Sequence, residues 1–230
     1  MPSDLQSIAD PRLILLCWAA GLSLVAGIIS FARIVGPGFT WLTAGTAALV
    51  GLPGALAADG WWARAGLVLA LVGILRARNR PFAGLALMLA GLAYVTQAAI
   101  LGGWIPAATA TLALGGVSGE MALGHWYLVD PRLPRGALRD LAVVGIAGLV
   151  AESAMTVYLD VGFTGGSIGY WVLVITSVVL MAAVIAAIRY PAYSGVMAAT
   201  GLSYLALLTT LGTVFVGRAI VAGLGPFRFG

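Results

Sequence analysis

The chain consists of long apolar runs separated by short breaks rich in glycine, proline, asparagine and aspartate. A membrane-spanning helix needs about 20 mostly apolar residues, and the breaks carry ordinary turn residues. The third run is the weakest, because its apolar core is short and needs Trp61 and Trp62 as an interfacial anchor. The pattern predicts eight spans, at residues 13–34, 39–58, 61–77, 82–103, 105–128, 138–159, 168–189 and 193–217.

Composition indicates that lipid is the solvent for most of this chain. Hydrophobic residues make up 61% of the 230 residues and charged residues only 9%, whereas a soluble domain carries about 25% charged residues. So few charges cannot cover a surface that faces water. The sequence therefore predicts an all-α, polytopic transmembrane helical bundle, a single integral membrane domain over residues 1–230. We expect it in the cytoplasmic membrane of a bacterium or archaeon.

The arginines are distributed unevenly between the two sides of the predicted bundle. With eight spans, one side holds eight arginines and two aspartates (8 − 2 = +6), and the other holds four of each (4 − 4 = 0). Because arginine-rich short loops stay in the cytoplasm, both termini should face outward. Topology thus accounts for the basic charge, and no nucleic-acid partner is expected. The arginine-rich side comprises Arg33, Arg76, Arg78, Arg80, Arg132, Arg135, Arg139 and Arg189, and the other side Arg12, Arg64, Arg218 and Arg228.

A faint internal repeat accompanies the eight spans. Residues 81–102 resemble residues 191–212, with Gly-Leu-Ala-Tyr at 91–94 aligned to Gly-Leu-Ser-Tyr at 201–204. One interpretation is a parallel duplication of four helices, with halves at 12–103 and 105–217, as found in some transporters. The alternative is chance, because apolar sequence of low complexity aligns readily with itself.

Two glutamates lie deep inside the apolar runs. At 1.5 Å per residue, Glu120 and Glu152 should lie about 13 and 21 Å from the arginine-rich side. Intramembrane carboxyl groups are rare and often functional. Both share helix faces with glycines, so we expect them to face protein, in a polar layer with Gln97. They would either handle protons or lock helices together as neutral hydrogen-bonding groups, in which case Glu152→Gln should be tolerated.

The only histidine, His125, lies in the segment Gly-His-Trp-Tyr-Leu-Val-Asp-Pro at the arginine-rich end of the fifth span. Histidine exchanges protons near neutral pH, so His125, with Tyr127 and Trp126, is predicted to line a small-molecule site for a quinone. Haem b is the other candidate, but one histidine would need Met121, Met155 or a partner subunit as the second ligand. The simpler interpretation is a histidine among the aromatic residues usual at a membrane interface.

The remaining motifs narrow the choice of function. The clusters Arg76, Arg78, Arg80 and Arg132, Arg135, Arg139 are typical of contact with anionic lipid or with a cytoplasmic partner. One cysteine and one histidine predict no metal site, and the sequence contains no lysine for a Schiff base. Nucleotide-binding and hydrolase motifs are also missing from the sequence, so enzymatic activity is left open.

Three functions fit these observations. The first is a membrane subunit of a redox or respiratory complex, with a quinone or haem site, proton-handling carboxyl groups and neighbouring subunits. The second is a small-solute or ion transporter that uses Glu120 and Glu152 as coupling carboxylates. The third is a purely structural or assembly subunit.

Overall fold

The computed structural model describes residues 9–57, 60–130, 133–159, 167–190 and 192–223. These residues form eight helices and no strand, which confirms the all-helical prediction. The predicted spans agree with the helices to within four residues at every end. The helices are α2 (Pro11–Phe31), α3 (Pro37–Ala57), α4 (Trp61–Leu75), α5 (Arg80–Gly102), α6 (Trp104–Val129), α7 (Arg135–Tyr158), α8 (Ile168–Arg189) and α9 (Tyr193–Val221).

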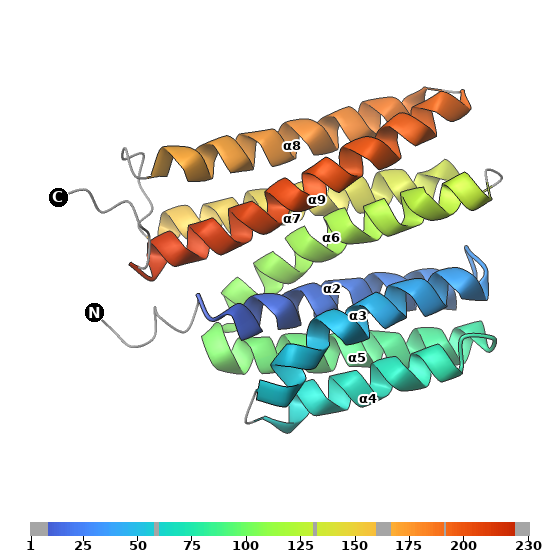
Figure 1. The fold of residues 1–230 in the computed structure, drawn as a ribbon, viewed down its shortest axis with the longest axis horizontal. Coiled ribbons are helices and arrows are strands. Elements are labelled where there is room, and N and C mark those ends of the chain that lie inside the picture. Colours follow the sequence, from blue (N-terminus) through green and yellow to red (C-terminus); the bar gives the residue numbers. More distant parts are fainter. Residues whose placement is uncertain (1–8, 58–59, 131–132, 160–166, 191, 224–230) are drawn as a thin grey trace.

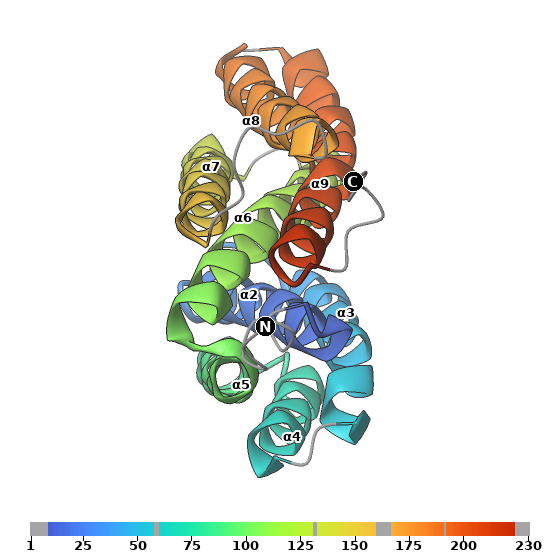
Figure 2. The same cartoon turned by 90° about the vertical axis from the view of Figure 1, so that its left-hand side faces the viewer.

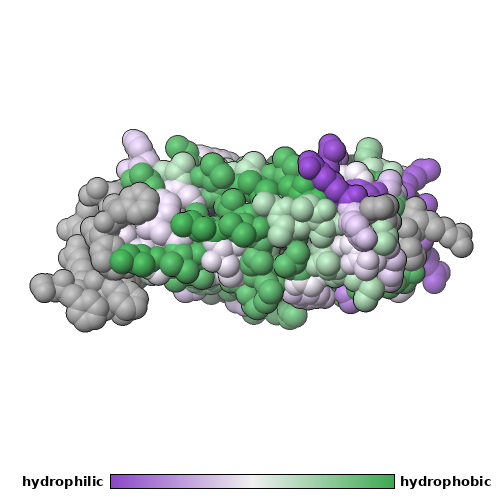
Figure 3. Space-filling view, turned by 90° about the horizontal axis from the view of Figure 1, so that it is seen from above, coloured by the Kyte–Doolittle hydropathy of each residue, from purple (hydrophilic) through white to green (hydrophobic). Residues whose placement is uncertain are grey.

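Six of the eight helices are long and apolar enough to cross a membrane, which indicates an integral membrane protein. The other two are α4, which has only 15 residues, and α6, whose 26 residues include several glycines and polar side chains. Apolar residues cover the middle of the face seen in Figure 3, and hydrophilic residues gather toward its right-hand end.

The helices run along one common axis and form two groups of four (Figures 1 and 2). In the first group, α2 packs against α3 and α5, and α4 packs against the same two helices. In the second group, α6 packs against α7 and α9, and α8 packs against these two. The groups meet mainly where α2 contacts α6. Helix α2 begins and α9 ends at the same end of the bundle (Figure 1).

Glycines bring α2 and α6 into backbone contact. A Cβ atom added to Gly21 would lie 2.4 Å from the Cα of Gly115, closer than any real carbon contact. One turn further on, Gly119 packs against Val25. Residues 115–119 form a Gly-x-x-x-Gly pattern, which permits close helix packing in membranes. This pattern therefore fixes the centre of the interface between the two groups.

The arginine-rich end is held together by two arginines that reach across to neighbouring turns. Arg80 donates to the Val35 carbonyl at 3.0 Å and so connects the start of α5 to the α2–α3 turn. Arg135 donates to the Tyr190 carbonyl at 2.6 Å and connects the start of α7 to the end of α8. Both bonds satisfy carbonyl groups of residues that lie between helices.

Candidate functional site

Glu120 and Glu152 are both buried, as predicted, with exposed fractions of 0% and 1%. They do not share one polar layer, however. Glu152 accepts a hydrogen bond from Thr109 of α6, and Thr109 lies eleven residues before Glu120 on that helix, or about 16 Å along its axis. The expected separation in depth was about 8 Å, so the sequence-based estimate is wrong. The two carboxyl groups belong to separate sites.

Glu152 forms a buried ion pair with Arg218. Arg218 Nε donates to Glu152 Oε1 at 2.9 Å, and the side chains are 0% and 1% exposed. Arg218 Nη2 also donates to the Pro106 carbonyl at the start of α6. Because Thr109 donates to the second carboxylate oxygen, this cluster joins α6, α7 and α9. Removal of either partner from such a buried ion pair strongly destabilises a protein, because the remaining charge is left buried without compensation.

The position of Arg218 corrects the sequence analysis, which assigned it to a loop on the arginine-poor side. Helix α9 continues to Val221, so Arg218 lies on its buried face. The arginine-poor side then keeps only Arg12, Arg64 and Arg228, the last of which lies outside the described residues. This increases the charge asymmetry between the two sides.

Glu120 has a different environment, without a cation. Ser203 Oγ bonds to Glu120 Oε2 and also lies 2.7 Å from the Ala199 carbonyl. Within the described part of the chain Glu120 forms no ion pair, and its other oxygen accepts no hydrogen bond. A buried carboxylate without a cation is very costly. The arrangement therefore fits a neutral Glu120 that donates to Ser203, while the Ser203 hydroxyl donates to Ala199.

Gln97 forms no hydrogen bond with either carboxyl group. Its amide packs against Gly60 at the start of α4, where an added Cβ would overlap it. It is 2% exposed, and its oxygen accepts no hydrogen bond from the described residues. Gln97, Glu120 and Glu152 are therefore not joined by hydrogen bonds, since Glu120 bonds to Ser203 and Glu152 to Thr109 and Arg218.

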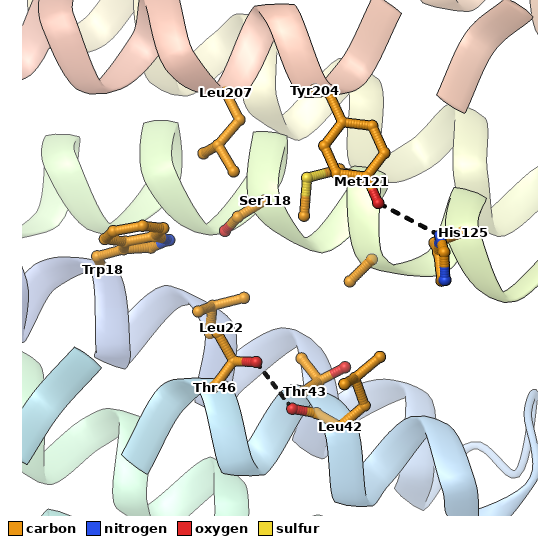
Figure 4. Close-up of a pocket in the computed structure, with 11 residues that line it drawn as sticks. Trp18, Leu22, Leu42, Thr43, Thr46, Ser118, Met121, His125, Tyr204 and Leu207 are labelled. Carbon is orange, nitrogen blue, oxygen red and sulfur yellow. Dashed lines mark hydrogen bonds between the residues drawn. The ribbon is translucent and has the colours of Figure 1, made fainter. Parts of the chain in front are cut away.

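His125 lines a cavity of about 300 Å³ between the two helix groups. Helices α2 and α6 form its floor, and α3 and α9 its walls (Figure 4). The Tyr204 hydroxyl and His125 Nδ1 are hydrogen-bonded at 3.3 Å at one end, and Trp18 lies at the other (Figure 4). Because His125 and Tyr204 are both exposed, the cavity opens on the surface of the bundle. The α6 side consists of Ser118, Met121, Ala122 and His125, and the other lining residues are Trp18, Leu22, Leu42, Thr43, Thr46, Tyr204 and Leu207.

Two buried polar groups in this cavity have no partner among the described residues. They are Trp18 Nε1 and Thr43 Oγ1, and the Thr43 residue is only 1% exposed. The Thr46 and Ser118 hydroxyl groups of the lining are satisfied locally, because Thr46 donates to the Leu42 carbonyl at 2.9 Å and Ser118 donates to the Leu114 carbonyl. Buried donors are almost always paired, and these two unpaired donors belong to residues that line the cavity.

The two aromatic neighbours of His125 do not line the cavity. Trp126 packs against Gly38 and Phe39 at the start of α3, with ring centroids of Phe39 and Trp126 6.3 Å apart. Tyr127 is 1% exposed and lies in the core of the second helix group. Tyr204, which is 79 residues from His125, takes the place that the sequence analysis gave to Tyr127.

The arginines of the two predicted clusters differ in what they contact. Arg80 and Arg135 donate to backbone carbonyls of neighbouring turns, whereas Arg76, Arg78 and Arg139 are exposed. Arg139 lies 3.9 Å from Asp140. Arg132 lies outside the described residues. In the described part of the chain, no group of three or more histidine, cysteine, aspartate or glutamate side chains could hold a metal ion.

Comparison of the chain with protein-family models, with curated proteins and with solved structures finds no match. Functional inference therefore depends on the geometry of the sites.

Proposed function

We propose that this protein binds a small, membrane-soluble dicarbonyl compound of the quinone class in the cavity between its two helix groups, as a membrane subunit of a redox complex. The observation that carries the proposal is the pair of unpaired buried donors, Trp18 Nε1 and Thr43 Oγ1. The volume of about 300 Å³ is at the lower limit of small-molecule pockets and suits a single ring system. Its opening on the bundle surface gives access from lipid.

The two ends of the cavity offer different chemistry to such a ligand. At the inner end, the Trp18 indole N–H can donate a hydrogen bond to one carbonyl, and the Thr43 hydroxyl, which lies between Trp18 and His125, offers a further donor (Figure 4). At the outer end, the imidazole of His125 faces the other carbonyl. When the Tyr204 hydroxyl donates to Nδ1, the neutral imidazole carries its proton on Nε2. His125 can then donate a hydrogen bond from Nε2 to the ligand, close to the arginine-rich end, where α6 ends four residues later at Val129.

Geometry disfavours the haem alternative. Met121 is the methionine beside His125 in the cavity, and it lies one turn earlier on the same helix. Two side chains on one helix face cannot bind opposite sides of one haem iron. Met155 belongs to α7, which contributes no residue to the cavity lining.

A transporter is the second candidate, favoured by the position of the cavity between two four-helix groups. Transporters with internal repeats bind substrates at such interfaces. The coupling role would then fall to Glu120, because Arg218 holds Glu152 as a fixed ion pair. The proton on Glu120 would be the coupling ion.

Binding of 1,4-naphthoquinone to the purified protein tests the primary proposal. Thr43→Val should weaken binding about three- to tenfold, which corresponds to one hydrogen bond. The same substitution should leave the stability of the free protein unchanged or raise it, because the buried hydroxyl has no partner there. Thr46→Val is the matched control, since the Thr46 hydroxyl already donates to the Leu42 carbonyl. Equilibrium dialysis and thermal-shift measurements give the affinity and the stability.

Naphthalene provides the ligand control, because it has the same ring system without acceptors. We expect naphthoquinone to bind more tightly than naphthalene to the wild-type protein, and this preference to become smaller in a Trp18→Phe, Thr43→Val double variant, which keeps only the His125 donor. Equal binding of the two compounds to the wild-type protein would contradict the proposal. So would equal losses from Thr43→Val and Thr46→Val.

We further propose that all eight helices span the membrane, with the arginine-rich end in the cytoplasm and both termini outside. Support comes from their common direction (Figure 1) and from the arginine asymmetry. In a Cys17→Ala background, a membrane-impermeant maleimide should label Arg64→Cys in intact cells and Arg78→Cys only after permeabilisation. Both positions are exposed. The reverse order of labelling would overturn the orientation.

The same neighbour relationships within the two helix groups favour a duplication with halves at 12–103 and 105–217. The surroundings of the corresponding side chains have diverged, however. Tyr94 is fully buried against Gly51 and Gly66, whereas Tyr204 is 45% exposed and lines the cavity. In this proposal the tyrosine is common to both halves and took up its place in the cavity only in the second half.

A further inference from the structure

A second cavity, of about 220 Å³, lies at the turn between α4 and α5 and is lined by Arg76, Asn79 and Phe82. It is separate from the cavity at His125, because none of its lining residues is shared. We propose that it binds the phosphodiester headgroup of an anionic lipid in the arginine-rich leaflet. This inference is independent of the proposed quinone site.

The turn that carries this cavity is held in place from three directions. The Asn79 N–H donates to the Arg76 carbonyl at 2.8 Å, which brings the two polar residues together. Trp41 Nε1 donates to the Ile74 carbonyl at 2.9 Å, and Arg80 donates to the Val35 carbonyl at 3.0 Å. The cavity is therefore formed before any ligand arrives, which lowers the entropic cost of binding.

The charges around the cavity favour a phosphate group. Arg76 and Arg78 are exposed, and in the described part of the chain neither forms an ion pair with a carboxylate. The segment 75–82 contains no acidic residue. The Asn79 side chain makes no capping bond to α5, so its amide can bind a ligand. The N-terminus of α5 adds a partial positive charge, and arginine binds phosphate oxygens in a bidentate manner.

Phe82 distinguishes a lipid from a free phosphate ion. Phe82 is 49% exposed and lies in the first turn of α5, where its ring forms an apolar wall beside the polar groups. A phosphodiester with an attached glycerol and acyl chain would cover this wall, whereas an inorganic anion would leave it bare. The bilayer leaflet that contacts the arginine-rich end supplies such headgroups, and each arginine at a membrane surface adds measurable affinity for them.

Native mass spectrometry of the detergent-purified full chain tests this site. The protein is equilibrated with equal amounts of phosphatidylglycerol and phosphatidylcholine, and the retained lipids are counted. The wild-type protein should retain mainly phosphatidylglycerol. Arg76→Gln should lower that retention about fivefold, the effect expected for one arginine at a membrane surface. Arg64→Gln, the same change at the opposite end of α4, should leave it unaffected.

One further variant and one competition experiment separate the possible outcomes. Asn79→Ala should also weaken retention of phosphatidylglycerol, which supports a defined site rather than general charge attraction. Displacement of the lipid by millimolar inorganic phosphate would identify a free-phosphate site and overturn the lipid assignment. Equal retention of both lipids, or equal effects of Arg76→Gln and Arg64→Gln, would overturn the site itself. Circular dichroism confirms that each variant is folded.

Discussion

Replacing Glu152 by glutamine is expected to destabilise the protein more than any other single conservative substitution in it. The carboxylate is the only counter-ion of Arg218 among the described residues, and both side chains are almost completely buried. Glutamine would leave a buried guanidinium without a compensating charge. The loss of one partner from a buried ion pair costs about 3–5 kcal/mol, which approaches the whole stability of many domains.

A double variant distinguishes the effect of the two charges on stability from the effect of side-chain packing. Glu152→Leu combined with Arg218→Met removes both charges and keeps apolar bulk at both positions. Replacement of a buried pair by apolar residues is often neutral or stabilising, so the double variant should be more stable than Glu152→Gln alone. Thermal unfolding in detergent, followed by circular dichroism, gives the comparison. A double variant that is less stable than both single variants would show that the ion pair does not act through charge.

Glu120→Gln is the matched control for this experiment. Glu120 is as deeply buried as Glu152, but its partner is the Ser203 hydroxyl. Glutamine keeps a neutral hydrogen-bonding group there, so the expected loss is about 1 kcal/mol, close to one hydrogen bond. If the two glutamine variants unfolded at the same temperature, the different charge states assigned to the two sites would be wrong.

This expectation reverses what the sequence suggested for Glu152→Gln. From the sequence, Glu152 was expected either to handle protons or to lock helices together as a neutral hydrogen-bonding group, and Arg218 was assigned to a loop. The spacing of small and polar residues in the last span indicates a longer helix. Buried positions recur along α9 at helical spacing, and extending that register reaches Gly217 and Arg218. The termination of a membrane helix is hard to place when no proline or glycine pair follows it directly.

The positions of the helices were predictable, because long apolar runs in the sequence indicate segments that are surrounded by lipid. The burial of Glu120 and Glu152 was also predictable, since glycines on the same helix faces indicate contact with protein. The pairing of helices was not. Apolar sequence carries little information about which helix packs against which, so the contact of His125 with Tyr204, 79 residues away, could not be read from the sequence. The cavity depends on that contact and on the crossing of α2 with α6.

That crossing provides the last prediction: Gly115→Val should separate the two helix groups. A Cβ atom at Gly115 would lie 2.5 Å from the Cα of Gly21, and one at Gly21 would lie 2.6 Å from the Thr111 carbonyl oxygen. These neighbours are backbone atoms, which cannot rotate away. The helices must therefore move apart, and the loss should exceed the 1–3 kcal/mol typical of an overpacked core. Gly115→Ala should lie between the wild-type protein and the valine variant.

Gly45→Ala is the control, because nothing lies within 4 Å of a Cβ added at Gly45 on α3. Alanine there should be neutral or should stabilise the helix by up to about 1 kcal/mol. The α2–α6 crossing also forms the floor of the cavity, so Gly115→Ala should weaken naphthoquinone binding while Gly45→Ala preserves it. Unfolding temperatures and dialysis measurements on the same preparations test both effects. Equal stability of the Gly115→Ala and Gly45→Ala variants would mean that α2 and α6 do not meet through their backbones. A stability loss at Gly115 without a change in binding would instead place the ligand outside the interface between the two groups.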